Sequence, residues 1–465
     1  MNPLREDKKE NCGIFGIFDN DMAVDLTYLG LYSLQHRGEE SCGIAVSAGR
    51  SIKQITGMGL VSEVLAPKKL KELKGRIAIG HVRYSTTGSS ILRNAQPFLI
   101  NHNKLSVSIA HNGNLVNAEK LCRRMEKEGS IFQSTMDSEI ILHLMVKSKK
   151  EVFEDRLVEA LSECEGAFSL LFLCEGKIIG VRDPLGLRPL CLGKKGDSYV
   201  LASETCSLDI IDAEYLRDIE PGEIIVIDSS GIKSMKPFEK RKPAQCIFEF
   251  IYFSRPDSII FGDSVYRVRK ALGKQLAREY PVDADMVISI PDSGNYAALG
   301  YSEESGLPFE FGIVRNHYIG RTFIQPSPEM RKHGVKIKLN PIKSVLKGKR
   351  VVVVEDSIVR GTTTRGRVKE IREAGASEIH MRISCPPIKY PCFYGIDFPS
   401  RKELIANEHK TVDEVARAIG VDSLKYLSME GMLSAIGDDN FCRACFSGIY
   451  PTKIRKSAVK SALER

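Results

Sequence analysis

Residues 351–364 read Val-Val-Val-Val-Glu-Asp-Ser-Ile-Val-Arg-Gly-Thr-Thr-Thr. The valine run predicts a buried strand that ends in two carboxylates, and the small residues after it predict the first turn of a helix. Free backbone amides and the helix dipole at such a turn attract a phosphate. A buried strand followed by a capped helix, with Asp356 or Ser357 bonding the first amides, is the plainer interpretation. It does not account for a Gly-Thr-Thr loop directly after two acids, so the segment predicts a phosphate site.

The strands around this segment predict a parallel sheet. Buried strands are expected at Val287–Ile290, Phe309–Val314, Val351–Val354 and Glu378–Ser384, and helices at 264–279 and 363–374. Strands that alternate with helices form parallel sheets covered by helices. The C-terminal half is therefore predicted to be a doubly wound α/β domain.

The N-terminal half has a different pattern. Short apolar runs alternate with Gly and Asn turns at 14–18, 43–47, 77–80, 105–110, 168–174 and 198–202. Helices are expected near 22–35, 117–128 and 137–148. This pattern predicts sheet packed on sheet, an α+β sandwich. A Pro- and Lys-rich stretch at 236–243 is the predicted boundary between the halves.

The composition is that of a packed protein with two or three domains. The 465 residues are 43% hydrophobic and 27% charged, and the net charge of +8 is modest, so no nucleic acid partner is expected. No apolar run is long enough for a bilayer, and residues 1–11 lack the apolar core of a secretory signal. The 12 cysteines therefore indicate a cytoplasmic protein without a disulfide framework or a membrane partner.

Cys12 is a candidate nucleophile. Removal of the charged leader, residues 1–11, would free its α-amine, whose ordinary pKa of about 8 suits a general base for the thiol. Taken alone, a buried cysteine at the start of a strand is the commoner case. Polar segments beside apolar strands favour catalysis: Gln35-His36-Arg37-Gly38, His81-Val82-Arg83-Tyr84-Ser85-Thr86, His111-Asn112-Gly113-Asn114 and Thr135-Met136-Asp137-Ser138-Glu139. The histidines in these segments lack metal spacing and are assigned to structural roles.

With Cys12, these segments resemble the N-terminal-nucleophile glutamine amidotransferases over nearly all of residues 12–230. The resemblance implies a four-layer αββα sandwich at 12–235, preceded by a propeptide, 1–11, that is removed. It also implies that Asn112 and Gly113 form the oxyanion hole, Arg83 and Asp137 bind the α-carboxylate and α-ammonium of glutamine, Gly38 and Thr86 line the pocket, and Arg37 supports the nucleophile. Singly, each could be an ion-pair partner or part of a hairpin turn.

The 351–364 segment resembles the signature of the type I phosphoribosyltransferases, which implies such a domain at 244–465. The residues implied to bind phosphoribosyl pyrophosphate are Glu355, Asp356, Ser357, Arg360, Gly361, Thr362 and Thr363, with Asp292, Ser293 and Gly294 of a pyrophosphate loop and Arg315, Arg321, Arg331 and Lys332 of a closing basic loop. Ser293, Glu355 and Asp356 are implied to hold one Mg²⁺ per subunit. The chain departs from the family pattern at Glu355, where Asp is usual, and at Gly334 and Lys336. A solvated basic loop is the alternative for 315–340.

Cys442 and Cys445 form a Cys-x-x-Cys pair, which alone suits zinc, an iron–sulfur cluster or no metal. Cys246 and Cys392 stand at positions that match the iron–sulfur branch of the glutamine amidotransferase family. This resemblance implies one [4Fe–4S] cluster per subunit, held by all four thiolates and tying together the start, middle and end of the second domain. The remaining cysteines are assigned mostly to packing.

The two halves in this order resemble the amidophosphoribosyltransferase family, which implies the first step of de novo purine synthesis. Glutamine, phosphoribosyl pyrophosphate and water would give 5-phosphoribosylamine, glutamate and pyrophosphate, with ammonia passing inside the protein. The resemblance also implies feedback inhibition by purine nucleotides of the AMP, GMP and ADP class, and a homotetramer. The alternatives are an amidotransferase that makes asparagine or an amino sugar, a purine-sensing regulator, and a degenerate paralogue.

Overall fold

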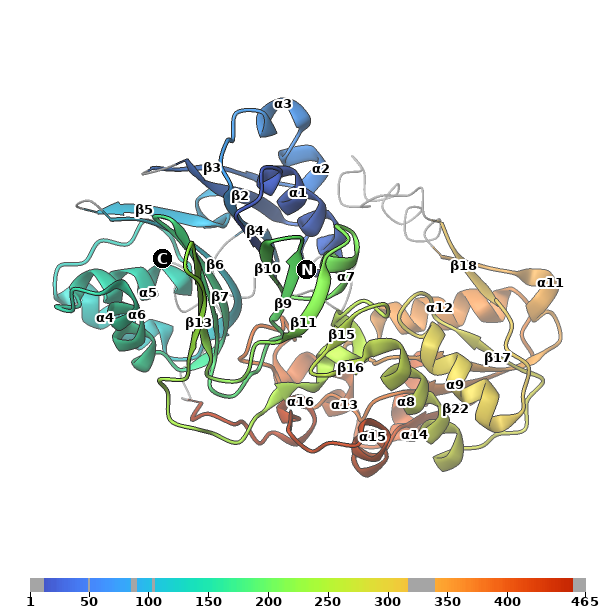
Figure 1. Ribbon diagram of the computed structural model, residues 1–465. Coiled ribbons are helices and arrows are strands. Elements are labelled where there is room, and N and C mark those ends of the chain that lie inside the picture. Colours follow the sequence, from blue (N-terminus) through green and yellow to red (C-terminus); the bar gives the residue numbers. More distant parts are fainter. Residues whose placement is uncertain (1–11, 49–50, 85–89, 103–104, 317–338, 455–465) are drawn as a thin grey trace.

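The computed structural model describes residues 12–48, 51–84, 90–102, 105–316 and 339–454, which form two halves side by side (Figure 1). The N-terminal half is built from two antiparallel sheets and their helices, and the C-terminal half from a parallel sheet and its helices. Among these residues, no helix has both the length and the apolar character needed to cross a bilayer.

The first sheet of the N-terminal half has the strand order β11-β9-β10-β1-β4-β2-β3. Its strands are β1 (Gly13–Phe18), β2 (Ser41–Ala48), β3 (Ser51–Met58), β4 (Ile77–Arg83), β9 (Cys191–Lys195), β10 (Ser198–Ala202) and β11 (Glu214–Asp218). The helices on this side are α1 (Ala23–Ser33), α2 (Val61–Val64), α3 (Pro67–Leu70) and α7 (Cys206–Asp209).

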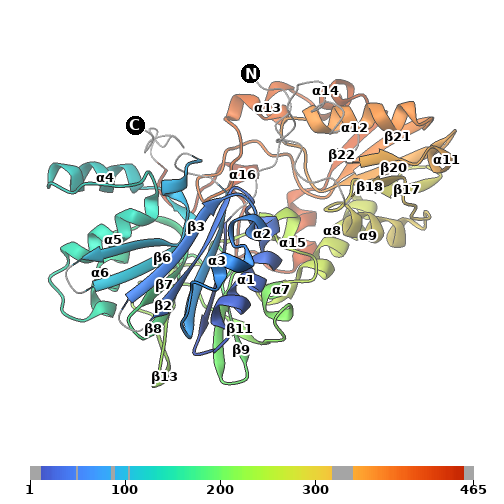
Figure 2. The ribbon, with the colours of Figure 1, turned by 90° about the horizontal axis from the view of Figure 1, so that it is seen from above.

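The second sheet has the order β13-β12-β8-β7-β6-β5. Its strands are β5 (Phe98–His102), β6 (Leu105–Leu115), β7 (Gly166–Cys174), β8 (Lys177–Arg182), β12 (Ile224–Asp228) and β13 (Gly231–Met235). Three helices cover its outer face: α4 (Ala118–Lys127), α5 (Asp137–Lys147) and α6 (Phe153–Ser162). In Figure 2 these helices lie on one side of the strands and α1, α2 and α7 on the other, so the predicted αββα layering is confirmed.

The C-terminal half contains the parallel sheet β17-β20-β21-β22. Its strands are β17 (Met286–Ser289), β20 (Arg350–Glu355), β21 (Glu378–Ile383) and β22 (Ser423–Tyr426). The helices of this half are α8 (Val265–Glu279), α9 (Asn295–Ser305), α11 (Lys343–Leu346), α12 (Thr362–Glu373), α13 (Ile405–Glu408), α14 (Val412–Ile419), α15 (Met429–Ile436) and α16 (Ala444–Ser447). The loops after β17 and β20 leave the same edge of the sheet because the two strands are parallel, which brings residues 290–294 and 356–361 together.

Short strand pairs complete this half. They are β14 (Gln245–Cys246) with β23 (Phe441–Cys442), β15 (Ile259–Ile260) with β16 (Asp263–Ser264), and β18 (Ile313–Arg315) with β19 (Leu339–Pro341). The expectation of a buried strand at Phe309–Val314 was correct only at its end, because regular pairing begins at Ile313 in β18. Phe309 only bridges Val287, and Phe311 is 63% exposed. Pro308 immediately precedes the segment and has no N–H to donate, and Gly312 within the segment weakens a strand.

Candidate functional site

Cys12 lies immediately before β1 and is buried, with 8% of its side chain exposed. Its Sγ donates a hydrogen bond to the Tyr84 carbonyl at 3.6 Å. Burial raises the pKa of the Cys12 thiol, and the positive charge of Arg83 opposes this effect only in part. The resting thiol is therefore neutral and needs a base before it can act as a nucleophile.

The side chains of Cys12 and Asn112 both point into the layer between the two sheets. Ile14 of β1 and Ala110 of β6 both belong to the apolar layer between the two sheets. Side chains alternate along a strand with a period of two, so Cys12 and Asn112 point into the same layer. The Asn112 Nδ2 is buried and has no hydrogen-bond partner among the described residues. It is thus an available donor on the nucleophile's side of the sheet, as an oxyanion requires.

His111 and Asp137 form a buried ion pair beside Asn112. The His111 Nδ1 lies 3.2 Å from the Asp137 Oδ1, and its Nε2 lies 3.2 Å from the Ala167 carbonyl. Burial is the largest single effect and would lower the pKa of His111, but the charge and hydrogen bond of Asp137, with the Ala167 carbonyl and the charge of Asp183, together raise this pKa. Burial opposes ionisation of Asp137 too, yet His111 and the Leu115 amide, 2.8 Å from Oδ2, lower the pKa of Asp137. Asp137 therefore remains an anion, and its charge contributes to raising the pKa of the Cys12 thiol.

Two glycines permit close backbone approaches here. Gly113 has a φ of 154°, and a Cβ on it would lie 2.1 Å from the Ala167 carbonyl oxygen. A Cβ on Gly38 would lie 2.6 Å from the Arg83 carbonyl carbon. Arg83 is buried and its Nη1 lies 3.8 Å from a Glu40 oxygen. Any larger side chain at either glycine would displace the backbone of a site residue.

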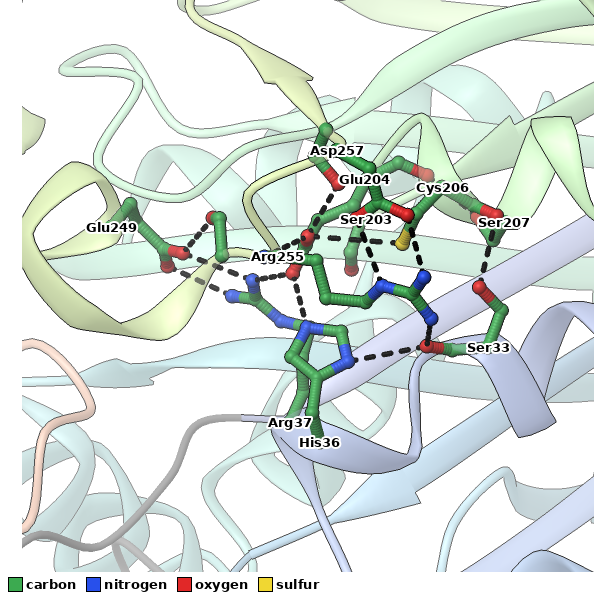
Figure 3. A network of polar contacts seen from close by, with 12 residues as sticks. Ser33, His36, Arg37, Ser203, Glu204, Cys206, Ser207, Glu249, Arg255 and Asp257 are labelled. Carbon is green, nitrogen blue, oxygen red and sulfur yellow. Dashed lines mark hydrogen bonds and ion pairs between the residues drawn. The ribbon is translucent and has the colours of Figure 1, made fainter. Parts of the chain in front are cut away.

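Arg37 lies between two buried carboxylates, those of Glu204 and Glu249 (Figure 3). Its Nε donates to the Cys12 carbonyl at 2.9 Å. Its Nη1 donates to Glu204 at 2.5 Å and to Glu249 at 2.9 Å, and its Nη2 donates to Glu249 at 2.8 Å. Glu249 also accepts from Arg188 at 3.1 Å, and Arg188 in turn donates to the Tyr394 carbonyl of the second half at 2.7 Å. Arg37 thus links the nucleophile to both halves.

A cavity of about 390 Å³ lies at the carboxyl edge of the parallel sheet. The implied phosphoribosyl residues in its wall are Asp292, Ser293, Arg315, Glu355, Ser357 and Thr363. Asp356 is almost fully buried behind this wall, where it accepts hydrogen bonds from the hydroxyls of Ser293 and Ser357. The Arg315 guanidinium pairs with Asp292. The strand and loop predicted to form a phosphate cradle therefore do border one cavity.

Other implied residues lie outside the cavity wall. The Arg360 Nη2 pairs with Glu403 at 3.2 Å. Gly361 precedes α12 with a φ of 73°, and Thr362 begins that helix. Gly294 precedes α9 and packs against the end of β20, where a Cβ would lie 2.6 Å from the Val354 oxygen. Some of the residues named in the sequence predictions lie outside the ranges that the structure describes. They are Thr86, Arg321, Arg331, Lys332, Gly334, Lys336 and the leader, residues 1–11.

Sequence reasoning missed several residues of the cavity wall. They include His36, Tyr252, Ser254, Arg255, Arg269, Tyr296 and Arg367. The sequence contained one indication that Arg269 has a special role. It follows Val268 on the buried face of α8, where a charged side chain is unusual. His36 comes from the N-terminal half, and no local pattern connects it to a site more than 200 residues away.

The four predicted cluster cysteines come from three separate segments. Cys246 and Cys442 are direct partners in the β14–β23 pair. The Cys392 Sγ accepts a hydrogen bond from the Tyr394 amide at 3.3 Å. Burial, together with the charges of Cys246 and Cys392, raises the pKa of Cys442 to about 12, so these thiols are near neighbours. Within the described ranges, no three His, Cys, Asp or Glu side chains are already arranged around a metal position.

Comparisons with known proteins agree with this geometry. The family described as glutamine amidotransferase domain matches residues 81–209. Amidophosphoribosyltransferase 2, chloroplastic, of Arabidopsis thaliana is 52% identical over 98% of this chain and 82% of its own length.

Two solved structures cover 97% of this chain. One, described as the allosteric regulatory enzyme of purine biosynthesis, has a TM-score of 0.93, 48% identity and 98% coverage of its own chain. The other is a glutamine phosphoribosylpyrophosphate amidotransferase from B. subtilis complexed with ADP and GMP, with a TM-score of 0.92, 47% identity and 100% coverage of its own chain.

Proposed function

Because this chain belongs to the amidophosphoribosyltransferase family, we propose that it makes 5-phosphoribosylamine from glutamine and phosphoribosyl pyrophosphate, the first step of purine synthesis. The observation that carries this proposal is Arg37, which donates to the Cys12 carbonyl and is held by Glu204 of the same half and by Glu249 of the half with the phosphate cavity. One chain therefore contains a thiol site and a phosphate site that share a buried support.

In the N-terminal half, the chain's own residues release ammonia. The Cys12 Sγ bonds to the side-chain carbonyl carbon of glutamine while its proton moves to the Cys12 α-amine, which is free only after residues 1–11 are removed. The Asn112 Nδ2 and the Gly113 amide stabilise the developing oxyanion. The amide nitrogen then leaves with that proton as ammonia, and water converts the thioester to glutamate. Arg83 and Asp137 hold the charged ends of the substrate.

In the C-terminal half, ammonia attacks the anomeric carbon as the bond from that carbon to the pyrophosphate oxygen breaks. The start of α12, with Thr363, holds the terminal phosphate, and Arg315 faces the leaving pyrophosphate. The oxygens of Glu355 and Ser293 in the cavity wall are hard donors that suit Mg²⁺. Asp356, the third residue predicted to hold Mg²⁺, lies behind this wall and accepts a hydrogen bond from Ser293. When bound, Mg²⁺ would neutralise charge on the pyrophosphate.

The first test is glutamate release by processed protein purified without oxygen, with and without phosphoribosyl pyrophosphate and Mg²⁺. We expect glutamate release to rise when the phosphoribosyl substrate is present, and pyrophosphate to appear in equal amounts. Processed protein that binds both substrates but releases neither product would contradict the proposal and point to a degenerate paralogue.

The proposed [4Fe–4S] cluster is supported by three buried thiols and a half-buried one, Cys442, and by the Cys246–Cys442 pairing. Cys246, Cys392, Cys442 and Cys445 would hold it, and it would fasten the ends of the second half together. We expect about four iron and four sulfide per chain, and most of that iron to be lost in Cys442→Ser. The control is Cys174→Ser, because Cys174 is a buried cysteine that lies in β7 of the other half. Stoichiometric zinc without iron would contradict this assignment.

Feedback by purine nucleotides is supported by the B. subtilis relative, which was solved with ADP and GMP. We expect GMP and ADP to compete with phosphoribosyl pyrophosphate, which an inhibition assay tests. The homotetramer and the cytoplasmic location stay predictions, and sedimentation of the purified chain tests the first of them.

A further inference from the structure

A short segment of the N-terminal half, residues 185–188, lies against the strand that contains Cys246. The Leu187 carbonyl accepts a hydrogen bond from the Cys246 amide at 3.0 Å. The Leu187 amide in turn donates to the buried Asp183 carboxylate at 3.2 Å. Both polar groups of this peptide are therefore fixed, and the next residue, Arg188, is held beside the predicted cluster site.

The Arg188 guanidinium packs against the loop that begins at Cys392. Its Nη2 and Nε donate to the Tyr394 carbonyl at 2.7 Å and 3.1 Å. The Tyr394 amide donates to the Cys392 Sγ at 3.3 Å. Gly395 has a φ of 103°, and a Cβ on it would lie 3.1 Å from the Arg188 Nη2. The glycine therefore lets the loop lie directly against the guanidinium.

Arg188 is fully buried, and a buried cation requires negative charge nearby. Its Nη1 donates to Glu249 at 3.1 Å, but Arg37 binds the same carboxylate through two nitrogens, at 2.8 Å and 2.9 Å. Burial would lower the pKa of this guanidinium, yet the negative charges of Cys246, Glu249 and Cys392 together raise it. The cysteines are therefore charge partners of Arg188 in addition to Glu249.

The four predicted ligand cysteines would bring net negative charge into the core of the protein. Four thiolates outweigh the positive charge of a [4Fe–4S] core, and reduction by one electron adds a further negative charge. Such a buried charge is costly unless an opposite charge lies close to it. Burial raises the pKa of the Cys246 and Cys442 thiols, and the positive charge of Arg188 opposes this rise. The field of Arg188 thus favours thiolates at this site.

We propose that Arg188 is the buried counterion of the [4Fe–4S] cluster: its positive charge offsets the negative charge of the four thiolates and tunes the reduction potential of the cluster. The inference rests on the proposed cluster and names a residue outside its four ligands that determines how firmly it is held. It also accounts for a charged residue at this position. A neutral donor would be enough to hold the loop, as Asn114 holds the Phe393 carbonyl at 2.9 Å.

Three variants separate the charge of Arg188 from its hydrogen bonds. Arg188→Gln removes the charge but keeps an amide donor, and Arg188→Lys keeps the charge. Asn114→Ala is the matched neutral control, because Asn114 also comes from the N-terminal half and binds the carbonyl that precedes that of Tyr394. Each protein is purified without oxygen. The readouts are iron and sulfide per chain, the rate of iron loss to a chelator, and the reduction potential of the cluster in an anaerobic titration.

We expect reduction of the cluster to become less favourable by about 10-fold or more in Arg188→Gln, because the added electron loses its counterion. For one electron this is a shift of about 59 mV to more negative potential. Iron should also be lost to the chelator about 10-fold faster or more. Arg188→Lys and Asn114→Ala should keep potentials and iron-loss rates close to those of the parent.

An unchanged potential and iron-loss rate in Arg188→Gln would overturn the counterion role, as would equal changes in Arg188→Lys or Asn114→Ala. A folded Arg188→Gln without iron, beside an iron-loaded Arg188→Lys, would support it. If Arg188→Gln does not fold, Arg188→Met takes its place, and the same outcomes decide. A parent chain that binds zinc and no iron would instead overturn the proposed cluster, and the counterion role with it.

Discussion

Replacing Cys12 with alanine is expected to abolish glutamate release, by about 10⁴-fold or more, while synthesis from added ammonia continues. The thiol is the only nucleophile proposed for the glutamine amide, and the cavity proposed to bind the phosphoribosyl group is lined mainly by residues of the other half. Ammonia supplied from solution bypasses the lost step. Pyrophosphate release with glutamine or with ammonium chloride, at a pH high enough to provide free ammonia, measures the two activities.

Cys42→Ala controls for the loss of a buried thiol. Cys42 lies in β2 and packs in the layer between the first sheet and its helices, away from the interior that Cys12 faces. This variant is expected to keep both activities. Substantial glutamate release by Cys12→Ala would show that another residue attacks glutamine.

Replacing Asn112 with alanine is expected to lower kcat for glutamate release by about 10²–10³-fold, the usual cost of one oxyanion donor. The Nδ2 has no partner among the described residues, so its removal breaks no other hydrogen bond seen there. Protein stability should change little for the same reason. Steady-state kinetics with glutamine and a thermal melt measure these two effects.

Ser108→Ala is the matched control for Asn112→Ala. The Ser108 hydroxyl is also a buried group of β6 without a partner among the described residues, but it lies four residues from Asn112, which is two repeats of the pleat along the strand. We expect kcat to be unchanged there. If Asn112→Ala raised the KM for glutamine and left kcat intact, Asn112 would be a substrate-binding residue and not an oxyanion donor.

The strands that form the cores of the two halves could be predicted from the sequence, because the apolar pattern of a strand lies within a few consecutive residues. The valine run before Glu355 became β20, and the apolar run before Phe18 became β1. Period-two alternation also determined that Cys12 faces inward. The strand prediction for Phe309–Val314 failed before Ile313. The apolar residues suggested a strand, but Pro308, just before the segment, and Gly312 do not favour regular pairing.

The resemblance of short motifs predicted which residues contact the substrates, such as Asn112 and Glu355, since these residues stand next to predictable strands and turns. What the sequence by itself determined is therefore the two folds and the motif at the end of each key strand. Only the tertiary structure decided how the two sites meet. Arg37 contacts Glu204 and Glu249 across 167 and 212 residues of sequence, and such contacts depend on how the two halves pack, which no local pattern contains.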